Sequence, residues 1–571
     1  MIAALVIFST FLGGMGIEFS GQVAIDSVGN IIVIGSTDSA DFTPSFGASP
    51  RVVDAFVMKL TADGSRVLWA RFLGGGRLED TLAIAVDSSD DIYIAGRTDS
   101  PDFPVTANAP QKQFGGGTFD GYVVKLSAEG EILFATYYGG SGADAPDGIA
   151  VDREGNFVIG GDTSSVDYPL VHPFQSTNRG GTDLFVTRFA SDGTVVYSTY
   201  IGSTASDAGH AITVDAAGNA WFTGAARTGD FPLINAVQPQ YGGNFGDAVI
   251  VELAPDGVVL TSTYLGGSGF DGGDAITVAP DGSIWVAGRS ESADFPLVNP
   301  IQGLAGKFDT FVAKLDPTGR TILFSTFIGG TQSDFPLDLV VASGGQAIVC
   351  GETASPDFPT RRAFQATYAG NLEDAFVTML KADGSGLVFS TFLGGSATEN
   401  CASMARSRDN LVAITGSTSS PNFPLVSPIR STLGGQDDYV AKLDFTADLQ
   451  LSATTPTIAR VRLLEPWSFR IENRGPNDAT DVAVTLLFSQ PVEIRNLTAP
   501  CVIASLTEVR CMFPSLERGR STVIAASIAP TEPGTVSVNG QVVAAEPLRG
   551  VPAISIAVEV PATRVRAVRF R

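Results

Sequence analysis

Seven acidic residues recur at one position of a sequence repeat, and their chemistry is that of a cation site. Each stands eight residues before the residue that ends the first predicted strand of its repeat: Glu18, Glu79, Asp144, Asp207, Asp271, Asp334 and Glu399. Like charges held close together raise each other's pKa and favour a bound cation, and oxygen ligands suit Ca²⁺. The pattern predicts an acidic ring that binds calcium. The alternative is that each carboxylate accepts hydrogen bonds from the backbone N–H groups of its own tight turn.

Other polar residues occur in only some of the repeats. Three repeats carry additional acid close to the ring position, at Asp147, Asp274 and Asp338, which would bias function toward those repeats. His210 lies near Asp207 and is the histidine closest to acid. As a catalytic base it would need a nucleophile or substrate that the sequence does not reveal. We therefore assign no catalytic residue from the sequence.

These residues belong to a repeat that fills residues 1–445. The segment DAFVMKL at 54–60 returns, with small changes, in segments that begin at Asp120, Asp183, Asp247, Asp309, Asp374 and Asp438. Six intervals over 384 residues give a mean period of 64. A second segment, DFP at 102–104, also has seven versions. Self-similarity at a fixed period indicates a repeat architecture.

Each repeat predicts four short antiparallel strands. Segments 149–152 and 157–160 are apolar runs separated by a Gly-Asn turn and should pair as a hairpin. The DFP segment belongs to a long loop, because proline lacks the N–H of a central strand. The DAFVMKL-type segment is the third strand, and a segment such as 260–267 is the fourth. Four antiparallel strands without helical periodicity predict a propeller blade, whose connecting loops place the seven acids around one face of the channel.

The two ends of the repeat region predict how the ring closes. The fourth-strand segment is missing after the seventh third strand, and its seventh copy stands at 8–14. The N-terminal strand should therefore complete the last blade, with residues 9–12 beside residues 438–443, which removes two unpaired edges. By this register, residues 1–17 are a strand and not a signal peptide or a membrane span. They also lack the basic residues that begin a signal.

The repeated segments resemble the bacterial β-propeller repeat family known as SBBP repeats, over nearly all of residues 4–445. The resemblance rests on five segments in fixed order, of the forms IAVD, GN, DFP, DAFVxKL and STYLGG. It implies a seven-bladed propeller in a secreted or surface bacterial protein, and the family carries no assigned reaction. The last two repeats depart from the pattern at 341–342 and 405–407, so the ring is not chemically uniform.

Residues 446–571 form a second predicted domain of alternating strands. About seven such runs suit an Ig-like β-sandwich. Segments 473–480, 501–511 and 516–521 resemble the Ig-like domain of unknown function number eleven, which is common as a stalk in bacterial surface proteins. The expected fold is thus all-β: a seven-bladed propeller in 1–445 and an Ig-like sandwich in 446–571.

The four cysteines favour one disulfide. Cys501 and Cys511 flank a predicted hairpin, and we expect them to be bonded, which would place the protein in an oxidising compartment. The alternative is a pair of buried thiols. Cys350 occupies a strand position where other repeats carry alanine, so a small core residue is the favoured interpretation. Cys401 could pair with it only across adjacent blades. Without a CxxC motif, zinc is not indicated.

Charge and composition exclude some functions. The net charge is −24, of which residues 446–571 contribute +2 and residues 1–445 contribute −26. Such acidity repels phosphate backbones and anionic lipids, so nucleic-acid binding is disfavoured, and no segment predicts a membrane span. The 64 glycines show no three-residue period, which excludes collagen and indicates many turns.

These observations predict a non-catalytic binding or scaffold protein. We expect an extracellular or surface-bound monomer, without a signal peptide in this chain, whose propeller binds a protein or polysaccharide and whose sandwich is a spacer. No cofactor is expected beyond Ca²⁺. Two alternatives stay open: a polysaccharide lyase or hydrolase with its site over the channel, and a structural module stabilised by calcium. A catalytic site would require polar residues that the other repeats lack.

Overall fold

The computed structural model describes residues 5–19, 21–39, 41–42, 53–243, 245–370, 372–498, 500–550 and 552–561. In these ranges the regular elements are all β-strands, which form antiparallel sheets, and there is no helix. The predicted all-β class is therefore confirmed. The chain packs into two compact units, Val6–Leu443 and a second that begins at Asp444. Nothing in the described ranges is a helix long and apolar enough to span a bilayer.

The described part of Val6–Leu443 forms seven sheets, each with four strands in order from an inner to an outer edge. The inner strands are β3 (Val23–Ile25), β7 (Glu79–Val86), β11 (Asp144–Val151), β15 (Ala208–Val214), β19 (Asp271–Val278), β23 (Asp334–Val341) and β27 (Ser403–Arg406). The second strands are β4 (Ile31–Thr37), β8 (Ile92–Thr98), β12 (Phe157–Thr163), β16 (Ala220–Ala226), β20 (Ile284–Ser290), β24 (Ala347–Thr353) and β28 (Leu411–Thr418).

The third strands are β5 (Asp54–Leu60), β9 (Asp120–Leu126), β13 (Asp183–Phe189), β17 (Asp247–Leu253), β21 (Asp309–Leu315), β25 (Asp374–Leu380) and β29 (Asp437–Asp444). The outer strands are β6 (Val67–Leu73), β10 (Ile132–Tyr138), β14 (Val195–Ile201), β18 (Val259–Leu265), β22 (Ile322–Ile328), β26 (Leu387–Leu393) and β1 (Leu5–Leu12). The first sheet has an additional short strand, β2 (Glu18–Phe19), which pairs with β4.

Tight turns join these strands because glycine supplies the backbone conformation they need. Gly155, between β11 and β12, has φ of 79°, and Gly193, between β13 and β14, has φ of 88°. Residues with a Cβ rarely adopt such positive angles. The Gly-Asn and Asp-Gly pairs in the sequence therefore mark the hairpins correctly.

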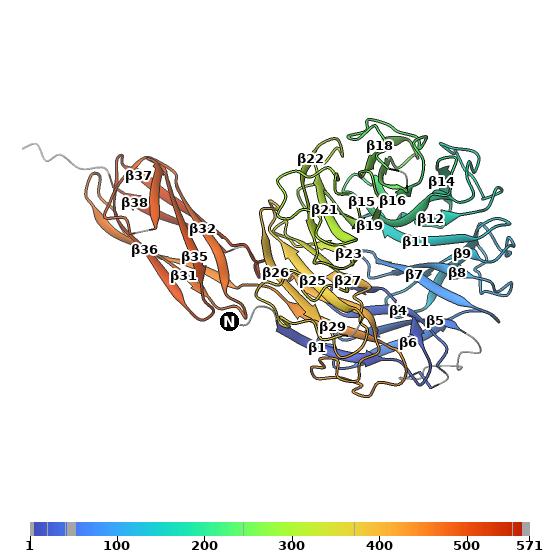
Figure 1. Cartoon of the computed structure of the whole chain (residues 1–571). Coiled ribbons are helices and arrows are strands. Elements are labelled where there is room, and N and C mark those ends of the chain that lie inside the picture. The colour runs from blue at the N-terminus through green and yellow to red at the C-terminus, as the bar shows by residue number, and fades with distance from the viewer. Residues whose placement is uncertain are drawn as a thin grey trace, which may run out of the picture. The chain divides into compact units, whose positions relative to one another are not determined.

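The inner strands contact one another in chain order. β3 packs against β7, β7 against β11, and so on to β23 against β27, and β27 in turn packs against β3. Figure 1 shows β7, β11, β15, β19, β23 and β27 gathered around a common centre.

The first strand of the chain belongs to the last sheet. β1 neighbours β29 in the sheet that also holds β28 and β27. Ser9 donates a hydrogen bond from its Oγ to the carbonyl of Pro424 at 2.8 Å, across 415 residues of sequence. The predicted pairing of residues 9–12 with the seventh third strand is therefore present.

The register of the last repeat differs by one residue from the sequence alignment. β29 begins at Asp437, whose carboxylate accepts a hydrogen bond from Gly434 N at 3.0 Å, as Asp120 does from Gly115. Asp437, and not Asp438, is thus the equivalent of Asp54. Asp438 instead occupies the position of Ala375 and is fully buried.

Aromatic side chains fill the space between neighbouring strands of the first unit. The aromatic residues of the DFP-type segments are at most 4% exposed: Phe42, Phe103, Tyr168, Phe231, Phe295, Phe358 and Phe423. Phe103, for example, stacks on Tyr122 of β9 with ring centroids 4.6 Å apart. Burial on this scale excludes these rings from any exposed binding surface.

The second unit consists of two sheets that share one core. Its strands are β30 (Leu449–Thr454), β31 (Glu465–Asn473), β32 (Ala479–Phe488), β33 (Val492–Arg495), β34 (Cys501–Ser505), β35 (Glu508–Leu516), β36 (Ser521–Pro530), β37 (Gly534–Val543) and β38 (Ala553–Val560). The sheet orders are β30-β31-β36-β33 and β34-β35-β32-β37-β38. Trp467 and Phe469 of one sheet pack with Val484 and Val538 of the other.

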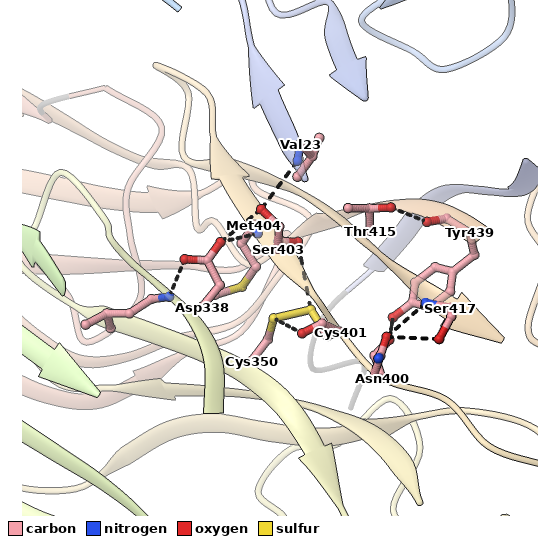
Figure 2. The surroundings of a disulfide bond; sticks show 11 residues. Val23, Asp338, Cys350, Asn400, Cys401, Ser403, Met404, Thr415, Ser417 and Tyr439 are labelled. Carbon is pink, nitrogen blue, oxygen red and sulfur yellow. Dashed lines mark hydrogen bonds between the residues drawn. A yellow bond between two sulfur atoms is a disulfide. The ribbon is translucent and has the colours of Figure 1, made fainter. Parts of the chain in front are cut away.

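Two disulfides are present among the described residues. Cys501 and Cys511, opposite each other on β34 and β35, are bonded, as the sequence led us to expect. Cys350 and Cys401 are bonded as well, which corrects the interpretation of Cys350 as a plain core residue. Figure 2 shows this second bond between β24 and the loop before β27, so it joins neighbouring sheets.

The inter-sheet disulfide should contribute strongly to the stability of Val6–Leu443. Replacing both Cys350 and Cys401 by alanine is expected to lower its free energy of unfolding by about 4 kcal/mol, because the bond closes a loop with a sequence separation of 51. Urea unfolding followed by tryptophan fluorescence measures the change. The matched control is the Cys501→Ala, Cys511→Ala variant, which should shift only the transition of the second unit. An unchanged transition of the first unit in the Cys350, Cys401 variant would contradict the prediction.

Candidate functional site

A central cavity of about 210 Å³ lies among the inner strands of Val6–Leu443. All seven inner strands, or the residue just before them, contribute to its lining. Four of the lining side chains are ionisable, namely Asp147, His210, Asp274 and Asp338. The cavity therefore combines one imidazole and three carboxyl groups that come from four consecutive sheets.

β-Bulges accompany the placement of two of these side chains, His210 and Asp274, in the cavity wall. The pairing of β15 with β16 skips His210, and the pairing of β19 with β20 skips Asp274. An extra residue in a strand is left unpaired and its side chain is re-aimed. Glycine at the facing position permits the bulge, because a Cβ on Gly288 would lie 2.1 Å from the carbonyl oxygen of Gly272.

Burial controls the protonation of His210 and Asp274. Burial raises the pKa of Asp274 to about 7, although the guanidinium of Arg289, 3.7 Å away, acts in the opposite direction. The Oδ2 atom of Asp274 has no hydrogen-bond partner among the described residues. Burial, together with Arg289, lowers the pKa of His210 to about 4. At neutral pH the imidazole is therefore uncharged and Asp274 is partly protonated.

A second group of charges adjoins Asp147. Burial, with Asp162 nearby, raises the pKa of Asp147 well above its usual range. Burial also raises the pKa of Asp162 to about 7, even though its carboxylate accepts a hydrogen bond from Gly209 N. Arg97 pairs with Asp80 at 2.9 Å on the neighbouring sheet. Asp147 on this side of the cavity thus keeps its proton at pH values where an exposed carboxyl group has lost it.

Asp338 joins three consecutive inner strands. Its Oδ2 accepts hydrogen bonds from Met404 N at 2.6 Å and from Ser403 Oγ at 3.1 Å, both on β27. Ser403 Oγ in turn accepts a hydrogen bond from Val23 N at 3.3 Å, on β3. Figure 2 shows this chain beside the Cys350–Cys401 bond. Asp338 consequently links neighbouring inner strands and also forms part of the cavity wall.

The seven acids predicted to ring the channel lie elsewhere. Glu18, Glu79, Asp144, Asp207, Asp271, Asp334 and Glu399 are at most 2% exposed, and none of them lines the central cavity. Asp334 is representative: it accepts hydrogen bonds from Gly330 N at 2.7 Å and Ser355 Oγ at 2.9 Å. This is the alternative considered for them, a turn-satisfying role. Within the described residues, no group of three or more His, Cys, Asp or Glu could hold a metal ion. Calcium binding stays a prediction.

Each of these acids instead lies beside the aspartate that opens a third strand. Asp144 adjoins Asp120, and burial with this neighbour raises the pKa of Asp120 to about 7. In the same way the pKa of Asp247, beside Asp271, is raised to about 6. One buried oxygen of Asp120 and one of Asp247 have no hydrogen-bond partner among the described residues. The pairs therefore hold protons at pH values where exposed carboxyls have lost them.

An aromatic row lies near Arg289. It consists of Phe270, Phe308 and Phe335, with ring centroids 6.4 Å apart for the first two and 5.8 Å for the last two. The guanidinium of Arg289 lies 5.8 Å from the Phe270 ring and 5.9 Å from the Phe335 ring. All three rings are partly exposed. The row is connected to the cavity through Arg289, whose guanidinium lies 3.7 Å from the carboxylate of Asp274.

The comparisons with known proteins identify no family. No protein-family model matches the chain. Among curated proteins, the regulatory protein FlaEY of Caulobacter vibrioides is 24% identical over 311 residues, which are 51% of this chain and 32% of FlaEY. The chain therefore spans about a third of the length of this relative.

Solved structures match at low overall similarity. The CARDB domain of a Pyrococcus furiosus protein, crystallised with di-metal ions, is 16% identical, with a TM-score of 0.17 over 20% of this chain and 90% of that one. A point mutant of the NanB sialidase from Streptococcus pneumoniae is 10% identical, with a TM-score of 0.32 over 74% of this chain and 68% of that one.

Sequence reasoning missed a set of residues, one near the end of each second strand, that differ in charge from sheet to sheet. They stand before the last residue of each second strand: Ser36, Arg97, Asp162, Ala225, Arg289, Glu352 and Ser417. The signal was available, because this position varies in charge while the glycine before it does not. Burial, with Glu373 nearby, raises the pKa of Glu352 to about 7. These side chains make the sheets chemically unequal.

The arrangement is suited to hydrogen bonding and stacking. Partly protonated carboxyls donate and accept hydrogen bonds, neutral His210 does both, and the aromatic row offers apolar faces. A cavity with a few convergent polar groups and perturbed pKa values is the usual form of a ligand site.

The buried carboxyl pairs predict an unusual pH dependence. A raised pKa means that folded Val6–Leu443 retains protons that the unfolded chain releases, so the free energy of unfolding falls as pH rises from about 4 to about 7. Replacing Asp120 by asparagine should reduce this fall, because its pKa of about 7 then drops out. Urea unfolding at pH 5 and pH 8 measures both proteins. Equal losses of stability in the two proteins would show that Asp120 is not protonated in the folded state.

Proposed function

We propose that this chain is a non-catalytic binding protein of the bacterial surface or exterior. In this proposal, Val6–Leu443 is a closed seven-bladed β-propeller of the SBBP type that binds a polysaccharide. The second unit is an Ig-like sandwich, similar to the domain of unknown function number eleven, that acts as a spacer. The observation that carries the proposal is the aromatic row around Arg289, the residue that also contacts Asp274 of the polar cavity.

Three features support the propeller. The inner strands contact each other in chain order, β27 packs against β3, and one cavity is lined from all seven inner strands. β1 supplies the outer strand of the last sheet, which leaves each sheet with four strands across. This is how propellers close.

The two disulfides support an oxidising location. Disulfides persist in secreted and surface proteins and are rare in the cytosol of most organisms. One bond joins the two strands of a hairpin in the second unit, and the other joins two neighbouring sheets of the first unit.

Sugar recognition fits the chemistry of the site. Pyranose rings present apolar faces and many hydroxyls, so they need aromatic surfaces and groups that both donate and accept hydrogen bonds. Phe308 and Phe335 offer the former, and His210 and Asp274 the latter. A net charge of −26 on residues 1–445 disfavours strongly anionic polymers and leaves neutral glycans as the favoured class.

The test is a glycan array probed with the intact protein, repeated with Phe308→Ala. Loss of the ring should weaken binding to a retained glycan at least about tenfold, which is about 1.4 kcal/mol. The matched control is Phe174→Ala, which removes a ring that is 42% exposed in the loop between β12 and β13 and should bind like the wild type. Equal affinity of Phe308→Ala and wild type for a glycan, or no binding to any glycan of the array, would overturn the proposal.

A second candidate function is glycan cleavage. It is favoured by the placement of His210 with Asp147 and Asp274 in one cavity, since glycosidases use two carboxyl groups and lyases a base. Any glycan retained on the array should be incubated with wild type and with His210→Ala. Reducing ends produced by the wild type and not by the variant would establish an enzyme, and intact glycan supports binding alone.

A further inference from the structure

A second, larger cavity lies at the other end of the inner strands. Its volume is about 680 Å³, and it is lined by strand ends and turns such as Val151, Val214 and Val278, and by Arg406. The central cavity uses Asp274 to Ile276 of β19, whereas this one uses Thr277 to Ala279. The two cavities therefore follow each other along the same strands. We call the larger one the turn-side cavity.

Arg406 differs from the residues at the equivalent position of the other repeats. The repeats can be aligned by a shared hydrogen bond across the turn between the first and second strands. The N–H of Ser407, the residue after Arg406, donates to the carbonyl of Leu411, and the N–H of Asp152 donates in the same way to the carbonyl of Asn156. By this register, the equivalents of Arg406 are Ile25, Val86, Val151, Val214, Val278 and Val341. One repeat thus places a guanidinium where six place an aliphatic side chain.

The side chain of Arg406 has no acidic partner in the described part of the chain. Its Nη1 donates to the carbonyl of Ser407 at 3.2 Å and to Asn410 Oδ1 at 3.1 Å. Burial lowers its pKa. Removing a cation from water without an anionic partner costs free energy. An anion bound at the remaining nitrogens would offset this cost.

The acids of the same region are already engaged. Asp152 pairs with Arg188, and Asp26 pairs with Lys59 at 3.0 Å. Asp215 lines the turn-side cavity, but its carboxylate accepts hydrogen bonds from Ala217 N at 2.8 Å and Asn219 N at 2.9 Å. Asp152 and Asp26 are thus paired with other cations, Asp215 is hydrogen-bonded within its own turn, and none of the three forms an ion pair with Arg406.

The volume and the lining of the turn-side cavity favour a ligand with an apolar part. Valines line it on several sheets, and its volume is in the range of small-molecule sites. Guanidinium recognises carboxylates with paired, charge-assisted hydrogen bonds. We propose that Arg406 and the surrounding valines bind the carboxylate of an amphiphilic ligand, that is, a carboxylate joined to an apolar body. Two sources share this chemistry, a medium-chain fatty acid and the apolar C-terminus of a peptide.

The test is calorimetric titration of the intact protein with octanoate and with its neutral analogue octanamide. Octanoate should bind at least tenfold more tightly than octanamide. Arg406→Val should remove this difference, and it should fold normally because valine is the residue of the equivalent positions. Arg406→Lys, which keeps the charge without the paired donors, should bind with intermediate affinity.

The peptide source is tested in the same way with acetyl-Ala-Val-Leu carrying a free carboxylate or an amide. Tighter binding of the free peptide than of octanoate assigns the site to peptide termini, and the reverse assigns it to fatty acids. The matched control is Arg408→Ala, an exposed arginine two residues away, which should change affinity less than threefold. Equal binding of acid and amide, undiminished binding by Arg406→Val, or no binding of either acid would overturn the proposal.

Discussion

The first unit depends on one repeated interaction, a buried acid that precedes or begins each inner strand. Asp144 shows its geometry: the carboxylate accepts hydrogen bonds from Gly140 N in the incoming loop and from Ser165 Oγ just beyond the second strand. One side chain therefore fixes the connection between two sheets and the pairing of two strands. Because the acid is buried next to a second carboxyl group, the hydrogen bonds that it accepts must offset the cost of its burial. The interaction is thus a constraint on every connecting loop.

Because of this constraint, the residues that build the sheets differ from the residues that line the central cavity. The loops and the glycine opposite each bulge are held constant, while the bulged residue itself is free to vary between His210, Asp274 and Leu337. The variable residues face the central cavity, and the constant ones face the protein interior. The same division occurs at the far end of the inner strands, where Arg406 replaces an aliphatic residue without changing the turn that follows it. The seven sheets therefore have nearly the same backbone structure but carry different side chains in the two cavities.

The strands were predictable from the sequence because local signals determine them. Turn glycines, the proline of each long loop and the apolar runs mark the four strands of each repeat without reference to the rest of the chain. The cavity was not predictable in this way. A bulge leaves one residue of the strand unpaired and re-aims its side chain, as at His210 and Asp274, and the alternation of the sequence does not reveal this. The Cys350–Cys401 bond depends on the packing of neighbouring sheets, and the register of Asp437 depends on hydrogen bonds with Gly434.

The pairing of β1 with β29 has a consequence for synthesis on the ribosome. Ser9 meets Pro424 only after 415 further residues have been made, which takes about 20 to 80 s at bacterial to eukaryotic elongation rates. During that time the segment LVIFSTFL is an apolar strand without a partner, the kind of segment that aggregates when it is left exposed. The last sheet therefore cannot be completed until β29 has been made, although its outer strand is made first.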